Sequence, residues 1–149
     1  MLIANLVLIL LLQTPAPGQA VIVGLRNGQQ LLVQNPEFSG FIESRNGEAV
    51  LIYREGSIHG EMPLKTVSRI EFGPYEKGHP FEIFVTMKDG QRLQLESARH
   101  DFVSVRGKTD QGIVTIKHPD PLSAPLKLRT KPPNRKKDLT IQYLEIPAS

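Results

Sequence analysis

Short turn signals recur along the chain, and their spacing constrains the fold more than any other feature. Asn27-Gly28, Asn35-Pro36, Asn46-Gly47, Glu55-Gly56 and Asp89-Gly90 each separate two runs of β-branched or aromatic residues. Asn-Gly tolerates positive φ and favours the tight type I′ hairpin turn. No segment after Val21 repeats apolar positions at the helical period of 3.6 over the roughly 10–12 residues that a helix needs. The sequence therefore predicts an all-β meander of hairpins.

The predicted strands fall into two series. The first comprises Val21–Arg26, Gln30–Gln34, Ser39–Ser44, Ala49–Arg54, Ser57–Met62 and Ser68–Phe72. The second comprises Phe81–Lys88, Gln91–Glu96, Phe102–Arg106, Gly112–Lys117 and Leu139–Ile146. Because both series use the same turn chemistry, the sequence invites a direct comparison of its two halves.

That comparison indicates an internal duplication. Leu25–Leu31 and Met87–Leu93 align with an offset of 62 residues, and the same offset places Met62–Lys65 on Ala124–Lys127. The last strands, Ile70–Phe72 and Leu144–Ile146, differ by 74, so the second copy is expected to have gained twelve residues before its final strand. The alternative is that any hairpin meander reuses Asn-Gly and Asp-Gly turns.

Both copies share one order of elements: strand, Asn-Gly or Asp-Gly, strand, polar turn, apolar strand, Gly-containing strand, Pro-Leu-Lys turn, short strand. Leu25–Gly28, Phe41–Ser44, Ala49–Tyr53 and Met62–Phe72 carry it in the first copy. This order resembles the five-stranded small barrels of the SH3-like and Sm-like class. The resemblance implies a tandem small-barrel protein of the bacterial cell envelope, and a helical turn at Pro63–Ser68.

The expected organisation has four parts. Residues 1–20 form a signal peptide, 21–74 a first five-stranded barrel and 75–80 a linker. Residues 81–149 form a second barrel with a basic loop inserted at 128–139. RNA binding, known for Sm-like proteins, does not transfer, because the loops at Ser44–Glu48 and Pro63–Lys65 lack the required Asp and Asn pattern.

The N-terminus resembles a secretory signal. Leu2–Leu12 is apolar except for Asn5. This run is too short to span a bilayer, which needs about 20 residues. Gly18-Gln19-Ala20 predicts cleavage after Ala20, although no Lys or Arg precedes the apolar run. An exported protein, periplasmic or extracellular, is expected. The alternatives are an uncleaved membrane tether and a buried first strand.

Catalytic and metal chemistry find little support in the sequence. The chain has no Cys, which excludes disulfides and thiolate sites, and its four His residues show no metal-ligand spacing. Duplication leaves open that His59 and His118 face one another in space. Arg99-His100-Asp101 alternate faces on a strand and cannot orient one another, and Glu43, Glu71 and Glu145 are expected on solvated sheet faces. No catalytic, cofactor or metal residue is predicted, and an enzyme is the third-ranked function class.

One segment makes the chain basic. The segment from residue 127 to 138 contains six basic residues and one Asp, which gives it a local charge of +5. The basic residues are Lys127, Arg129, Lys131, Arg135, Lys136 and Lys137. Since the whole chain carries +3, the remainder carries −2. This cluster is the candidate site for a protein partner or an anionic lipid or glycan, unless it is simply a solvated loop. No aromatic residue is interleaved with it, so nucleic acid is not expected.

The sequence thus predicts a non-catalytic binding or assembly module. Its contacts would run through open strand edges, to a partner or a second copy, and through the basic loop. Val21-Ile22-Val23 would follow the cleavage site directly, and either close the first barrel or add to a neighbour. The alternative function is peripheral binding to anionic surfaces by the loop alone.

Overall fold

Antiparallel strands make up nearly all of the structure, a computed structural model that describes residues 20–74, 80, 82–98, 102–118 and 140–147. The strands are β1 (Ala20–Leu25), β2 (Gln30–Gly40), β3 (Ile42–Arg45), β4 (Glu48–Glu55), β5 (Ile58–Pro63), β6 (Val67–Phe72), β7 (Glu82–Met87), β8 (Arg92–Ser97), β9 (Val103–Thr109), β10 (Gly112–His118) and β11 (Ile141–Glu145). A 3₁₀ turn, η1 (Leu64–Thr66), precedes β6. The all-β class and the helical turn before that strand are confirmed.

Several predictions fall outside the described residues. They are the signal segment up to residue 19, most of the linker at 75–80, and the basic loop at 128–139. Ala20, the last residue of the predicted signal, is the buried first residue of β1 and pairs with Gln34. Cleavage after Ala20 would therefore leave Val21 to begin the strand. Within the described ranges, no helix is long and apolar enough to cross a membrane.

The prediction of a turn at Asn35-Pro36 is wrong, because β2 runs through this dipeptide as a bulge. Asn35 adopts a φ of 50°, and the register with β9 shifts between Gln34 and Glu37. The extra residue changes which side chains face the core: Leu31 and Val33 are buried before the bulge and Phe38 after it. Proline fits here because a bulge leaves one residue without a ladder hydrogen bond.

Two Asn-Gly turns differ in conformation. Asn46 and Gly47 have φ of 49° and 81°, both positive, as a type I′ turn requires. In the Asn27-Gly28 loop only Gly28 has a positive φ, of 91°. The prediction of a type I′ turn is therefore confirmed at Asn46-Gly47 and wrong at Asn27-Gly28. There the Asn27 side chain accepts a hydrogen bond from the Gln29 N–H at 2.9 Å and stabilises a longer loop.

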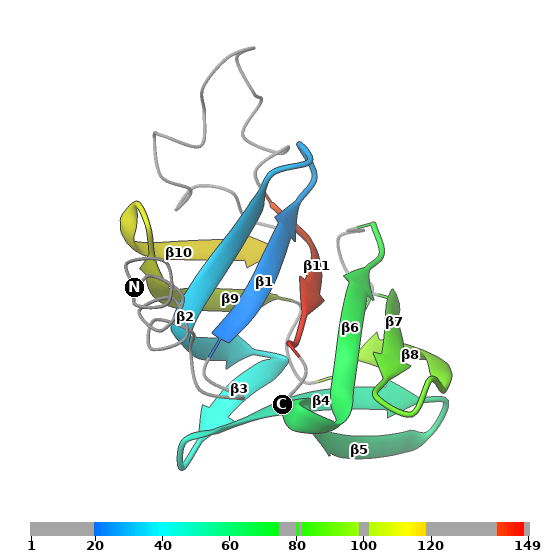
Figure 1. The fold of residues 1–149 in the computed structure, drawn as a ribbon. Helices are drawn as coiled ribbons and strands as arrows, with labels where there is room; N and C mark the ends of the chain where they lie inside the picture. Colours follow the sequence, from blue (N-terminus) through cyan, green and yellow to red (C-terminus); the bar gives the residue numbers. More distant parts are fainter. Residues whose placement is uncertain (1–19, 75–79, 81, 99–101, 119–139, 148–149) are drawn as a thin grey trace, which may run out of the picture.

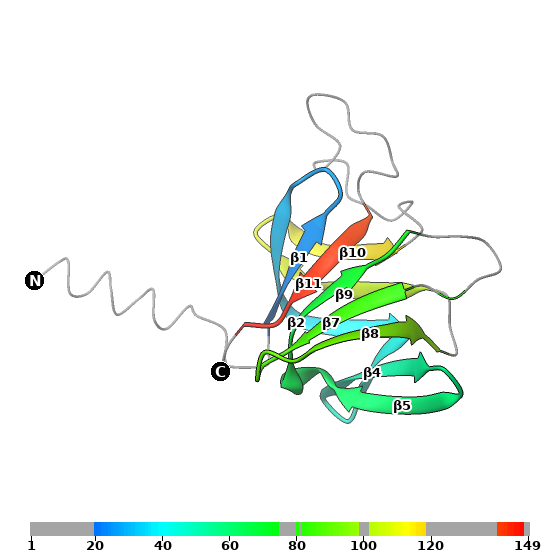
Figure 2. The ribbon, with the colours of Figure 1, turned by 90° about the vertical axis from the view of Figure 1, so that its right-hand side faces the viewer.

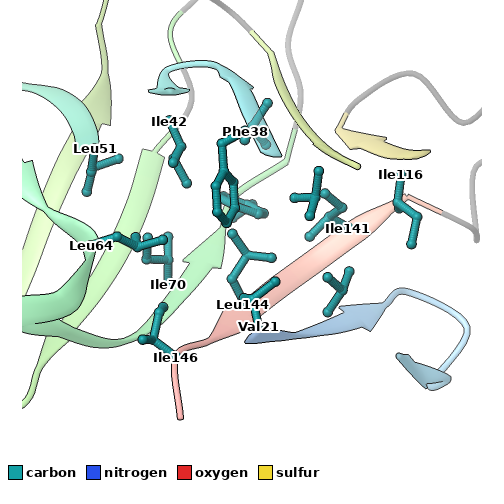
Figure 3. Packing of buried hydrophobic residues seen from close by; sticks show 14 of the residues in the cluster. Val21, Phe38, Ile42, Leu51, Leu64, Ile70, Ile116, Ile141, Leu144 and Ile146 are labelled. Carbon is teal, nitrogen blue, oxygen red and sulfur yellow. The ribbon is translucent and has the colours of Figure 1, made fainter. Parts of the chain in front are cut away.

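All strands join one curled antiparallel sheet (Figures 1 and 2). Its order is β10-β9-β2-β1-β11-β6-β7-β8-β4-β3, with β5 on β4. Only Phe41 separates β2 from β3, and the pairing of β3 with β4 brings the two ends of this order back towards each other. The curl encloses one continuous apolar core to which both halves of the chain contribute, including Val21, Ile70, Ile116 and Leu144 (Figure 3).

The structure does not confirm two separate tandem barrels. The order contains two groups of five, β10-β9-β2-β1-β11 and β5-β4-β8-β7-β6, and each group draws strands from both halves of the chain. The first strand, β1, pairs with the last, β11, and the sheet continues from β11 to β6. Val21-Ile22-Val23 therefore lie in an interior strand, between β2 and β11, rather than at an open edge.

Equivalent hydrogen bonds nevertheless recur in the two groups. The Leu25 N–H donates to Gln29 O at 2.9 Å, and the Met87 N–H, 62 residues later, donates to Gln91 O at 2.8 Å. The Arg26 N–H donates to Thr140 O at 3.2 Å. Its counterpart, the Lys88 N–H, donates to Thr66 O at 3.0 Å, and the two acceptor residues, Thr66 and Thr140, are 74 positions apart. The same register irregularity follows in β1–β11 and in β6–β7.

The offset is not constant between these points, which corrects the ungapped alignment. Gln34 pairs with Lys108 as Glu96 pairs with Arg54, so β4 and β9 differ by 54 residues. Between the points of offset 62 and 54, the second half is eight residues shorter than the first. Between the points of offset 54 and 74 it is twenty residues longer, so its net gain is twelve residues. Pro63, opposite Val50, corresponds by register to Lys117 rather than to Pro125.

Cleaving the connection between the halves tests the crossed pairing. We expect that a chain cut at a protease site introduced within residues 75–79 elutes as one complex in native buffer and unfolds in one transition. The reason is that neither fragment holds a complete five-stranded group. The measurement is size-exclusion chromatography with denaturant unfolding, and uncut protein is the control. Two fragments that separate while folded would contradict the pairing.

Candidate functional site

The predicted basic cluster lies outside the described residues, but the structure places both ends of the connection that carries it. β10 ends at His118, 1% exposed, and the chain returns at Thr140, 3% exposed, one residue before β11. The Arg26 N–H holds the Thr140 carbonyl. The connection from residue 119 to 139 therefore leaves directly from the end of β10 and is anchored at both ends by buried residues.

Three strands pair on one side only among the described residues: β10 with β9, and β3 and β5 with β4. β3 has four residues and continues from β2 through Phe41, so β5 and β10 are the longer edges. β5 and β10 carry the two large hydrophobic side chains that are most exposed in the described part of the chain, Ile113 on β10 at 66% and Ile58 on β5 at 62%. An exposed edge presents unpaired backbone N–H and C=O groups, so an apolar side chain beside it marks a surface suited to strand addition.

The two edges are not equally protected. β5 is interrupted by Gly60 and ends at Pro63, and Glu61 forms an ion pair with Arg45 on β3, the other strand that pairs with β4. Charges and proline are devices that discourage pairing of an edge with another strand. β10 instead reads Gly-Ile-Val-Thr-Ile-Lys-His, with four consecutive β-branched residues and one charged side chain, Lys117. The open edge of β10 is therefore the candidate site.

The predicted carboxylates are surface groups held by arginine. Glu71 and Glu145 both pair with Arg69, the former at 2.9 Å, and Glu43 pairs with Arg45. The Arg69 guanidinium also lies 4.0 Å from the centre of the Tyr143 ring. These contacts link β6 to β11 across the outer face. Partly exposed ion pairs of this kind contribute at most about 1 kcal/mol each, so their geometry indicates positioning of the sheet rather than chemistry.

The structure does not bring the histidines together. His59 is exposed on β5 and His118 is buried on β10, at opposite edges of the sheet order. His79, His100 and the rest of the Arg99-His100-Asp101 motif fall outside the described residues. Among the residues that are described, no three His, Asp or Glu side chains gather in a way that could hold a metal ion.

His118 is part of the core. Its ring stacks on Phe72 with centroids 5.3 Å apart, and Phe72 in turn meets Phe41 edge-on at 5.7 Å. Burial disfavours the charged imidazolium, and the positive charge of Arg26 acts in the same direction. Together they lower the pKa of His118 to about 4, against an opposing backbone hydrogen bond with Ile141. His118 is thus a neutral aromatic at neutral pH, at the point where the basic connection begins.

Sequence reasoning missed the residues that make the edge distinctive. Ile113 was part of a predicted strand, but its exposure depends on β10 being outermost, which follows from long-range pairing. The contrast between the four β-branched residues of β10 and the Gly and Pro of β5 was visible in the sequence and is the signal that would have found it. No protein-family model, curated protein or solved structure matches the chain.

Titration of His118 gives a testable dependence of stability on pH. Since its pKa is lowered from 6.5 to about 4 in the folded state, the unfolded chain binds more protons between these values. Stability from this residue is present above pH 6.5 and is lost as the pH falls towards 4, by up to about 3 kcal/mol. His118→Phe, which keeps an aromatic ring on Phe72, is expected to flatten the profile.

The measurement is the free energy of unfolding by denaturant at a series of pH values from 4 to 8. The matched control is His59→Gln, because His59 is exposed on β5 and should leave the pH dependence as it is. A profile unchanged by His118→Phe would show that the imidazole is not buried in its neutral form.

Proposed function

We propose that the chain is a non-catalytic binding or assembly module of the cell envelope that adds an extended segment of a partner protein to the edge of β10. The observation that carries the proposal is the exposure of Ile113 on an outermost strand. A partner strand would gain affinity from main-chain hydrogen bonds along the open side of β10, from Gly112 towards Lys117. Its specificity would come from side chains that meet alternate residues of the edge.

The side chains of β10 suit such an addition. Val114 and Ile116 are buried, at 4% and 1%, while Ile113, Thr115 and Lys117 point the other way and are wholly or partly exposed. An added strand would extend both faces: apolar residues continue the core side, and residues facing Ile113 and Thr115 remove their apolar surface from water. Lys117 and the basic connection that follows favour a partner segment with acidic flanks.

We further infer that the two halves of the chain are diverged copies whose strands have been exchanged. The recurring hydrogen bonds at offsets of 62 and 74, and the matching irregularities of register, support a duplication. Each small SH3-like or Sm-like unit would then combine two strands of one copy with three of the other. On this interpretation β5 and β10 are equivalent edges, of which β5 has been protected and β10 left open.

Replacing Ile113 tests the edge. We expect that Ile113→Lys abolishes capture of the partner from an envelope extract, because a lysine on an edge strand opposes strand addition. The matched control is Leu32→Lys: Leu32 is also an exposed aliphatic side chain, at 45%, but it lies on the interior strand β2. Both variants should unfold within about 0.5 kcal/mol of the parent chain.

Two results would count against the proposal. If Ile113→Lys captures the same proteins as the parent, the edge of β10 is not the binding site. If instead the parent chain associates with itself in sedimentation velocity and Ile113→Lys does not, the edge is used, but its occupant is a second copy rather than a partner protein. Ile58→Lys, on the opposite edge, shows whether β5 contributes.

The second candidate function is peripheral binding to anionic lipid or glycan, favoured by the local charge of +5 between Lys127 and Asp138. Attraction by charge alone weakens as salt rises. We expect co-sedimentation with anionic vesicles at low ionic strength to fall steeply by 0.5 M salt, and to be lost on deletion of residues 128–138. Binding that persists in high salt, or in the deletion variant, would reject this candidate.

A further inference from the structure

An open hollow of about 300 Å³ lies on the outer face of the sheet, over β6, β7 and β8. Phe84 of β7 lies in the middle of it, with Glu71 as its register partner on β6 and Gln94 as its partner on β8 (Figure 2). Ile83 and Val85, on either side of Phe84 in the chain, are buried in the core, so Phe84 points outwards. The volume lies at the lower end of the range for small-molecule sites, about 300–1,000 Å³.

The ring of Phe84 is 41% exposed, although β7 is an interior strand. Tyr143, in the same row of the outer face, is covered: the Arg69 guanidinium lies 4.0 Å from its ring centre, and Gly24 on β1 leaves room for the ring. In the described part of the chain, no aromatic ring or cation lies over Phe84. An uncovered ring presents a flat apolar surface whose face carries partial negative charge. It therefore suits a ligand with a flat array of C–H groups.

Polar side chains surround the ring. Glu71, Thr86, Arg92 and Gln94 line the hollow, and Thr86 and Arg92 are register partners across β7 and β8. Glu71 is held by Arg69 at 2.9 Å, which fixes the carboxylate and leaves it further lone pairs for a ligand. The guanidinium donates, the carboxylate accepts, and the amide and hydroxyl do both. Since the charges of Glu71 and Arg92 cancel, the hollow favours a neutral ligand with many hydrogen-bonding groups over an ion.

We propose that this hollow binds a neutral pyranoside, such as a β-glucoside, with one face of the sugar ring stacked on Phe84. A β-glucoside carries its hydroxyls around the edge of the ring and its axial C–H bonds on both faces, which matches a flat ring with a polar rim. Cross-strand neighbours stand about 4.5–5.5 Å apart and diagonal ones about 7–8 Å. Glu71, Arg92 and Gln94 therefore lie where the hydroxyls at the edge of a stacked sugar would reach them. Because the platform is an interior strand, it needs little ordering when the sugar binds.

Titration of the ¹⁵N-labelled full chain with methyl β-D-glucopyranoside tests the site. We expect saturable shifts at the amides of Phe84, Thr86, Arg92 and Gln94. Sorbitol, which has comparable hydroxyls but no ring, should bind at least about fivefold more weakly, and methyl β-D-glucuronide, which adds a negative charge, should bind no more tightly than the glucoside. Equal affinity for sorbitol, tighter binding of the glucuronide, or the absence of saturation by the glucoside would overturn the proposal.

Replacing the ring tests the stacking. Phe84→Leu keeps an apolar side chain but removes the flat surface, so affinity for the glucoside should fall by about fivefold, and Phe84→Trp should retain it. The matched control is Phe102→Leu, because Phe102 is also a partly exposed phenylalanine, at 37%, and does not line the hollow. Undiminished binding by Phe84→Leu, or an equal loss in Phe102→Leu, would show that Phe84 is not the platform.

The polar rim gives an independent readout. Arg92→Gln should lower the affinity for the glucoside by about threefold or more, because it removes a charged hydrogen-bond donor, whereas Arg106→Gln on β9 should leave the affinity unchanged. Deletion of residues 128–138, which tests the charge-driven candidate function, should leave the shifts at Phe84 as they are. Loss of the sugar in that deletion variant would assign it to the basic connection and overturn the site on β7. Neither outcome bears on strand addition at β10, which is a separate surface.

Discussion

The pairing of β6 with β11 is the contact on which the rest of the architecture depends. It joins the final strand of each half of the chain, and its central pair, Ile70 and Leu144, is fully buried. On the other side of each strand of this pair, β1 adds to β11 and β7 adds to β6. Each five-stranded group therefore contains strands from both halves of the chain, and the two groups share a single continuous core.

This arrangement explains why local structure was predictable and the pairing was not. The hairpins at Asn46-Gly47, Glu55-Gly56 and Asp89-Gly90 are encoded by residues that tolerate positive φ, and they form where the sequence places them. The choice of partner for β1 is different. Five of its six residues are buried and only Ile22 is partly exposed, so this apolar strand would fit β6 of its own half as well as β11, and the sequence is equally compatible with separate barrels and with crossed ones. Only tertiary packing distinguishes them.

The bulge at Asn35-Pro36 shows a second limit of pattern reading. Asn-Pro is a turn signal by its chemistry, yet here the same properties serve to insert a residue into a strand. Gly107 on the facing strand makes the bulge possible, because a Cβ there would lie 2.5 Å from a Val33 methyl group and 2.7 Å from the Gln34 carbonyl. That requirement joins positions more than seventy residues apart and is not expressed in either segment alone. The rest of β2, and β3 after it, follow directly on this bulge in the chain.

The site proposed for strand addition lies at one end of the sheet order, far from the pairing of β6 with β11, and that pairing gives a physical reason. Residues at the centre of the sheet are paired on both sides and packed on the core, so changes there would disturb both groups at once. The outer edges and the connections that lead to them are free of this constraint. β5 contains Gly60 and Pro63, whereas β10 contains an uninterrupted run of four β-branched residues. Long-range pairing also closes slowly, since β1 must wait for a strand more than a hundred residues away. A chain of this kind exposes several strand edges while it folds, and an edge that stays unprotected in the native sheet continues to favour aggregation. The unprotected edge of β10 therefore supports the proposed role in binding.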